Sequence, residues 1–157
     1  MFLNWRSLAF RIIKSLISRK FPDVKWLTTK ELAQWLADPV KQLQPIILDA
    51  RSEAEYALSH LKNAERIAPD EPNVERVTRV PDTPIVVYCS VGYRSARIAQ
   101  QLEQAGFSHV YNLEGSIFQW ANEGRPVCQN DRPTTLVHPY NALWGMLLKP
   151  QSRAPVE

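Results

Sequence analysis

Hydrophobic residues recur along residues 2–17 at spacings of three and four, which is the pattern of an amphipathic helix. Charged residues such as Arg11 and Lys14 interrupt any continuous apolar run. A secretory signal would need an unbroken apolar stretch of about 7–15 residues. We therefore predict a basic amphipathic helix within residues 1–22. Its apolar positions are Phe2, Trp5, Leu8, Ala9, Ile12, Ile13, Leu16 and Ile17.

From residue 24 the pattern changes to short apolar runs that alternate with helical segments. The helices that follow the first two predicted strands begin with capping boxes, Thr28 with Glu31 and Ser52 with Glu55. Alternating strands and helices predict an α/β fold, with a central parallel sheet of about five short strands and helices on both faces. The strands are predicted at 24–27, 45–49, 65–68, 84–88 and 109–113, and the helices at 28–37, 52–57, 74–79, 95–105 and 116–123.

Three regions follow from this pattern: the helix of residues 1–22, an α/β domain at 23–127, and a tail at 128–157. The tail is rich in proline and shows no strand or helix periodicity, except for an apolar cluster at 143–148. We expect this cluster to pack over the surface of the domain. An exposed patch there would instead indicate dimerisation, and the sequence leaves the oligomeric state open.

The net charge of +3 belongs to the amino-terminal segment. Residues 1–20 hold five basic residues and no acid, which leaves 14 basic against 16 acidic residues for the rest of the chain. A mildly acidic body argues against nucleic-acid binding. The basic helix has three interpretations: packing on its own domain or on a sister subunit, peripheral contact of residues 1–20 with an anionic membrane, or a transit peptide.

Two cysteines, Cys89 and Cys128, are too few for a disulfide scaffold and have no zinc-binding spacing. The three histidines, His60, His109 and His138, are isolated as well. We expect no metal and no other cofactor. A cytoplasmic location is expected, because a working thiol must stay reduced.

Cys89 lies directly between a predicted buried strand and a helix, in the segment Cys89-Ser90-Val91-Gly92-Tyr93-Arg94-Ser95. Backbone N–H groups of such a loop and the helix N-terminus stabilise a thiolate, the nucleophilic form of cysteine. Gly92 allows a turn with positive φ. Arg94 adds a forked donor for an oxyanion. This combination predicts a catalytic Cys89.

Four motifs in order resemble those of rhodanese-like single-domain sulfurtransferases, over about two thirds of the chain. They are Asp49-Ala50-Arg51 followed by Glu55-Tyr56, then His60-Leu61-Lys62-Asn63-Ala64, the Cys89–Arg94 loop with Ser95, and Leu113-Glu114-Gly115-Ser116 followed by Trp120 and Gly124-Arg125-Pro126-Val127. Asn63 and Ser116 depart from the family pattern, each standing where the family has glycine. Either departure could alter a turn, and neither removes a reacting group.

The resemblance implies a two-step sulfur transfer. Cys89 takes sulfane sulfur from a small anionic donor, thiosulfate or a persulfide, and passes it to cyanide or a thiol, which could belong to a protein. Arg94 would orient the donor and Tyr93 would shape the mouth of the pocket. Ser90, Val91, Gly92 and Ser95 complete the substrate-binding loop, and Asp49 and Arg51 would support the active face, where Arg51 could also contact substrate.

Two other functions compete with this interpretation. Phosphatases and arsenate reductases of related fold have five residues between their cysteine and arginine, whereas this loop has four, a ring better suited to one sulfur atom than to a phosphate. A non-catalytic binding module would be expected to lack Cys89. Cys128 is not expected to resolve the persulfide, because the helix at 116–123 should carry it about 12 Å or more towards the opposite end of the sheet.

Overall fold

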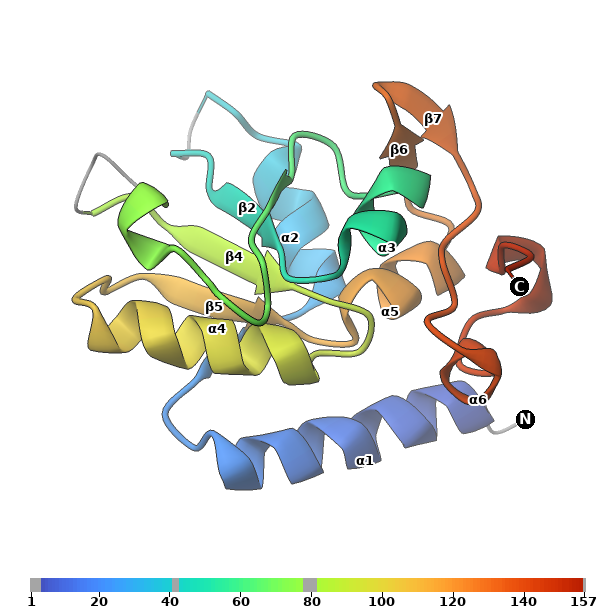
Figure 1. Ribbon diagram of the computed structural model, residues 1–157, viewed down its shortest axis with the longest axis horizontal. Helices are drawn as coiled ribbons and strands as arrows, with labels where there is room; N and C mark the ends of the chain where they lie inside the picture. Colours follow the sequence, from blue (N-terminus) through green and yellow to red (C-terminus); the bar gives the residue numbers. More distant parts are fainter. Residues whose placement is uncertain (1–3, 41–42, 78–81, 157) are drawn as a thin grey trace.

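Five parallel strands form the central sheet of the computed structural model, which describes residues 4–40, 43–77 and 82–156 (Figure 1). The order across the sheet is β1-β5-β4-β2-β3, so β4 lies at its centre and is fully buried. The predicted parallel sheet is confirmed. Its strands are β1 (Lys25–Leu27), β2 (Ile46–Asp49), β3 (Glu65–Arg66), β4 (Ile85–Tyr88) and β5 (Val110–Leu113).

Alternate residues of each strand point to opposite sides of the sheet, and helices cover both sides. In β4, Val86 and Tyr88 join an apolar cluster with α2 (Thr29–Leu36) and α5 (Ser116–Asn122). Ile85 and Val87 join a second cluster with α4 (Tyr93–Gln104). Both predicted capping boxes are formed, at the starts of α2 and α3 (Glu53–Leu58).

Two helix predictions need correction. The helix predicted at 74–79 is a 3₁₀ turn, η1 (Val74–Arg76), and residues 78–79 lie outside the described residues. α4 begins at Tyr93, two positions before the predicted start at Ser95. Gly92, three positions after Cys89 and with φ of +115°, turns the chain into the helix, and this places Arg94 in the first helical turn.

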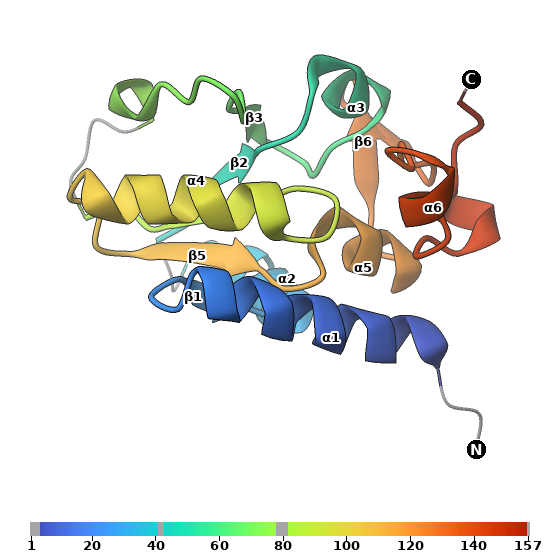
Figure 2. The same ribbon diagram turned by 60° about the horizontal axis from the view of Figure 1, so that its bottom comes forward.

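The amino-terminal helix α1 (Trp5–Lys20) packs on its own domain, beside the β1 edge of the sheet (Figure 2). Phe10 is buried in the first apolar cluster and Ile17 in the second. This confirms packing on the same chain, the first of the three interpretations. A second stripe on the helix faces solvent, formed by Trp5, Leu8, Ile12 and Leu16. No described helix is both long and apolar enough to cross a membrane.

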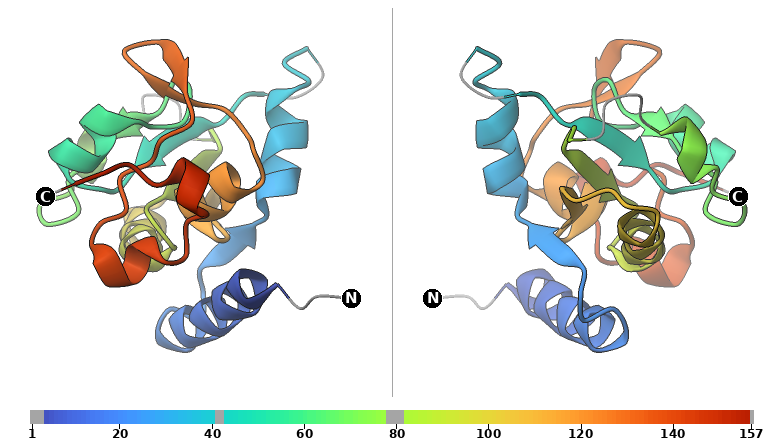
Figure 3. Two further views of the ribbon diagram at one scale, coloured as in Figure 1. Left: turned by 90° about the vertical axis from the view of Figure 1, so that its right-hand side faces the viewer. Right: turned by 90° about the vertical axis from the view of Figure 1, so that its left-hand side faces the viewer.

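The tail is more regular than predicted. It contains an antiparallel hairpin of β6 (Val127–Gln129) and β7 (Arg132–Thr134), then α6 (Ala142–Gly145) and the 3₁₀ turn η2 (Pro150–Ser152). Elements of three or four residues are too short to show a periodic pattern. The hairpin and α1 lie at opposite ends of the molecule in Figure 3.

Contacts from two helices hold the tail against the domain. Leu147 and Leu148 are buried, and Asn122 of α5 bonds the backbone on both sides of Leu148, at the Leu147 carbonyl and the Lys149 N–H. Arg6 of α1 donates from Nε to the Met146 carbonyl at 3.1 Å. Leu147 and Leu148 of the apolar cluster therefore pack on the domain as expected, whereas Leu143, Trp144 and Met146 of the same cluster are exposed.

Candidate active site

Cys89 stands at the carboxyl end of β4, on a short loop that leads into α4. Its Sγ accepts the Gly92 backbone N–H at 3.1 Å and lies 3.4 Å from the Ser95 Oγ. The residue is only 1% exposed, so the sulfur is held inside the loop rather than on its surface. The predicted positive φ of Gly92 is confirmed and turns the chain from this loop into α4.

Asn112, a buried residue of β5, ties this loop together. Its Nδ2 donates to the Gly92 carbonyl at 2.9 Å, and its Oδ1 accepts from the Ser95 hydroxyl at 2.6 Å. The two contacts anchor the loop and the first turn of α4 to the neighbouring strand. Sequence reasoning missed Asn112, and its one signal is a polar residue within an apolar strand.

Ser116, one of the two departures from the family pattern, hydrogen-bonds the backbone of Cys89. It adopts a φ of +49°, so the backbone keeps the left-handed turn that glycine would favour. Its Oγ accepts the Cys89 backbone N–H at 3.2 Å and donates to the Leu113 carbonyl at 3.0 Å. Asn63, the other departure, adopts a φ of +64°, a conformation that asparagine tolerates better than most residues.

Arg94 is held by Glu55, which sequence reasoning had seen only as a helix cap and family motif residue. The guanidinium donates to both carboxylate oxygens, at 2.8 and 2.9 Å. Ser90 joins the pair, with its Oγ 3.1 Å from Glu55 and 3.0 Å from Arg94. Burial alone would raise the pKa of Glu55, but the hydrogen bonds and charge of Arg94 lower it to about 2. The positive charge of Arg94 is therefore compensated within the protein.

Asp49 and Arg51 form a fully buried ion pair at 2.7 Å. Arg51 also donates to the Ser59 carbonyl, and the Tyr88 hydroxyl donates to Asp49 while accepting the Leu61 N–H. Burial and the Asp49 charge raise the pKa of Tyr88 well above its usual value. This network joins the ends of β2 and β4 to the segment after α3. Arg51 does not line the cavity beside Cys89.

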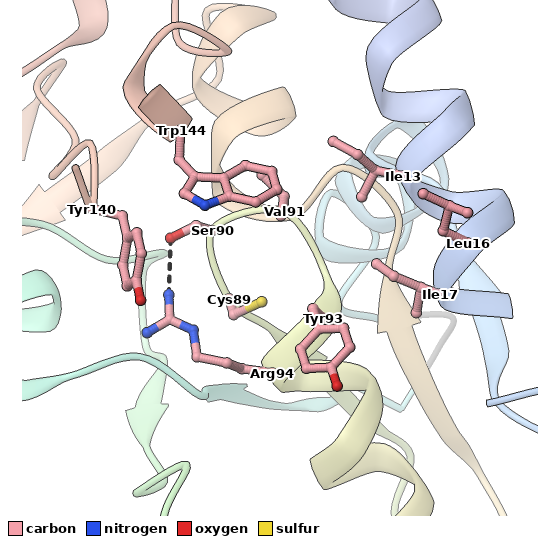
Figure 4. A pocket seen from close by; sticks show the side chains of 10 residues that line it. All are labelled: Ile13, Leu16, Ile17, Cys89, Ser90, Val91, Tyr93, Arg94, Tyr140 and Trp144. Atoms are coloured by element: carbon pink, nitrogen blue, oxygen red, sulfur yellow. Dashed lines mark hydrogen bonds between the residues drawn. The ribbon is translucent and has the colours of Figure 1, made fainter. Parts of the chain in front are cut away.

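A cavity of about 300 Å³ opens beside Cys89, and its walls come from three parts of the chain (Figure 4). The floor is the predicted loop, the second wall is α1, and the third is the tail. Gly92 and Ser95 touch the sulfur from inside the loop without lining the cavity. The lining residues are Ile13, Leu16, Ile17, Cys89, Ser90, Val91, Tyr93, Arg94, Tyr140 and Trp144.

Cys128 does not lie at the opposite end of the sheet, and that expectation was wrong. The chain turns back after α5, and Cys128 exchanges backbone hydrogen bonds with His60. The neighbours of His60 contact Arg51 and Tyr88 at the carboxyl ends of the strands. Cys128 is nevertheless buried in β6 and absent from the lining of the Cys89 cavity. His60 itself stacks on Tyr56, with ring centroids 4.2 Å apart.

The described residues contain no group of three or more His, Cys, Asp or Glu side chains that could hold a metal ion. Glu55, the nearest carboxylate to Arg94, has both oxygens engaged by that guanidinium. The site thus offers a buried sulfur, a compensated ion pair and a largely apolar cavity above them.

Comparison with known proteins places these features in a family. The profile of the rhodanese-like domain matches residues 30–123. A sulfurtransferase of Allochromatium vinosum is 33% identical over 105 residues, which cover 66% of this chain and 94% of that protein. The probable adenylyltransferase/sulfurtransferase MoeZ of Mycobacterium tuberculosis is 33% identical over 102 residues, 64% of this chain but only 25% of that protein.

Among solved structures, the polysulfide-sulfur transferase homodimer of Wolinella succinogenes superposes with a TM-score of 0.59 at 25% identity. The match covers 77% of this chain and 90% of that one. The fold, the order of the motifs and the cysteine loop after β4 agree with the profile match. The chain belongs to the rhodanese-like domain family.

Proposed function

We propose that the protein is a sulfurtransferase that carries sulfane sulfur on Cys89 as a persulfide. The observation that carries this proposal is Cys89 in the lining of the cavity, with the Gly92 N–H donated to its Sγ at 3.1 Å. A donated hydrogen bond stabilises negative charge on the sulfur that attacks. The family and its sulfurtransferase relatives support the same chemistry.

The reaction has two half-steps. The Cys89 thiolate bonds the outer sulfur of the donor, and the donor's S–S bond breaks with its electron pair going to the leaving group, which is sulfite when the donor is thiosulfate. The acceptor, cyanide or a thiolate, then attacks the outer sulfur of the persulfide and restores the Cys89 thiolate. This is covalent catalysis of the ping-pong kind.

Phosphate chemistry suits this site less well. A phosphate group needs several uncompensated donors around it. Here Arg94, the one charged residue in the described lining of the cavity, already gives two hydrogen bonds to Glu55. A non-catalytic role is disfavoured because Cys89 is present and belongs to the lining of the cavity.

Mass spectrometry tests the proposal. After incubation with thiosulfate or a polysulfide, the Cys89 peptide should gain about 32 Da, the mass of the one sulfur atom that the covalent mechanism transfers. Cys89→Ser should gain nothing, while Cys128→Ser should gain the same mass as the wild type. If the wild type stays unmodified but hydrolyses p-nitrophenyl phosphate through Cys89, the protein is a phosphatase instead.

We also propose that α1 touches an anionic membrane on the cytoplasmic side. Its solvent-facing stripe includes Trp5 and Leu8, and Arg11 and Arg19 are exposed on the same helix. Apolar side chains flanked by cations suit the interface of an anionic bilayer. The protein should pellet with phosphatidylserine-containing vesicles but not with phosphatidylcholine alone. Trp5→Ser with Leu8→Ser should abolish pelleting, and equal pelleting with both vesicles would argue against the proposal.

A further inference from the structure

Two walls of the Cys89 cavity lie outside the segment that matches the family profile. That segment is residues 30–123, whereas Ile13, Leu16 and Ile17 come from α1 and Tyr140 and Trp144 from the tail. Figure 4 shows the cysteine between the α1 side chains on one side and Arg94 with Tyr140 on the other. The walls thus come from parts of the chain that the family profile does not cover.

These walls are apolar, and the charge within them is compensated. Arg94 is the one Lys, Arg, Asp or Glu among the described residues that line the cavity, and Glu55 pairs with it through two hydrogen bonds. An inorganic dianion such as thiosulfate would lose hydration here, and the cation that lines the cavity, Arg94, is already paired with Glu55. The cavity therefore does not favour a small, highly charged donor.

The cavity is also larger than such a donor requires. An apolar cavity of about 150 Å³ holds a benzene molecule. The volume beside Cys89 is about 300 Å³, enough for a ring together with a reacting sulfur group. Small-molecule pockets begin at about this size and are lined mostly by apolar and aromatic side chains.

We infer that the Cys89 cavity selects sulfur donors that carry an apolar group, aryl or alkyl thiosulfonates and persulfides, and that α1 and the tail determine this selection. The inference rests on the proposed sulfur transfer. With a thiosulfonate, the Cys89 thiolate bonds the outer sulfur of R–SO₂–S⁻, the S–S bond breaks, and R–SO₂⁻ leaves with the electron pair. With a persulfide R–S–SH, the leaving sulfur takes the donor's proton and departs as R–SH. Neither reaction needs an oxidant or a reductant.

The test offers the full chain three sulfur donors: thiosulfate, methanethiosulfonate and benzenethiosulfonate. Cyanide is the acceptor, and thiocyanate is the product measured. Each kcat/KM is divided by the rate of the same donor with a free thiol in solution, which removes differences in intrinsic reactivity. We expect benzenethiosulfonate to exceed methanethiosulfonate by about tenfold or more, the discrimination that a small apolar contact provides.

Two variants and two matched controls locate the selection. The ratio of the corrected kcat/KM values for benzenethiosulfonate and methanethiosulfonate is the quantity compared. Leu16→Asn and Trp144→Ala should each reduce this ratio by about threefold or more, as expected when part of an apolar contact is removed. Ile12→Asn is one turn away on α1, 54% exposed against 58% for Leu16, and Leu143→Ala adjoins Trp144. Neither control residue lines the cavity, and both should keep the wild-type ratio.

The outcomes separate the two proposals. A wild-type ratio near one, or a ratio that the two wall variants leave unchanged, would overturn the inference while sulfur transfer stands. If no donor gives thiocyanate, the proposed function itself fails. A variant that fails to fold loses activity with all donors, and the other wall variant then decides the matter.

Discussion

Replacing Glu55 by glutamine should destabilise the protein by an amount that shrinks as the pH falls. The carboxylate is 2% exposed and accepts hydrogen bonds from Arg94, Ser90 and Ser52. These contacts lower its pKa from 4.5 to about 2. At about 1.4 kcal/mol per pKa unit, the ionised carboxylate contributes about 3 kcal/mol to the free energy of unfolding.

The direction of this pH dependence follows from the lowered pKa of Glu55 in the folded state. The contribution is complete above pH 4.5, the value for the unfolded chain, and is lost as the pH falls towards about 2. Glutamine resembles the neutral carboxyl group. The gap between wild type and Glu55→Gln should thus be about 3 kcal/mol at pH 7 and about 1.5 kcal/mol at pH 3. Other carboxyl groups titrate in both proteins and cancel from this gap.

Urea unfolding followed by tryptophan fluorescence at both pH values measures the gap. Glu53→Gln is the matched control, because Glu53 is on the same helix with its side chain 87% exposed, 3.6 Å from Arg66. It should change the unfolding free energy by less than about 0.5 kcal/mol. A gap for Glu55→Gln that is the same at pH 7 and pH 3 would refute the reasoning.

Three further predictions concern the backbone around the site. Gly92→Ala should lower stability by about 1–2 kcal/mol, because a φ of +115° disfavours alanine. The substitution should also move the backbone N–H that is donated to the sulfur and so slow persulfide formation. A rate of persulfide formation equal to wild type by mass spectrometry would contradict this. Ser116→Ala should cost about 1–3 kcal/mol in urea unfolding, since the buried Cys89 N–H loses its acceptor. Asn63→Ala should lower stability by about 1 kcal/mol and Asn63→Gly by none, because φ is +64°; equal urea midpoints for both would oppose the explanation.

The signals that predicted the fold were local ones. Apolar runs located β2, β4 and β5, and the capping boxes of Thr28 and Ser52 located the starts of two helices, because both patterns depend on residues a few positions apart. The cysteine loop was recognised for the same reason. Elements of three or four residues, such as β6, β7 and α6, hold too few positions for a period to appear.

The rest of the site depends on contacts between distant residues. Glu55 and Arg94 are 39 positions apart, and Asn112 is 20 positions from Gly92, so no local pattern links either pair. Because the capping box already accounted for Glu55 as a helix cap, there was no reason in the sequence to expect its second partner, Arg94. The stripe of α1 predicted a packed helix, but not that Leu16 would stand beside the cysteine.

Arg6 and Met146, 140 positions apart, are joined by a hydrogen bond, and this contact ties the two flanks of the domain to each other. The loop that carries Cys89 and the flanking walls of its cavity occupy separate stretches of chain. If these walls select the donor, as we infer, variation in the flanks changes which compound enters while Cys89 and its loop stay the same. Exchanging α1 and the tail together between homologues should transfer the donor preference. Exchanging only one of them would replace only one of the two flanking walls.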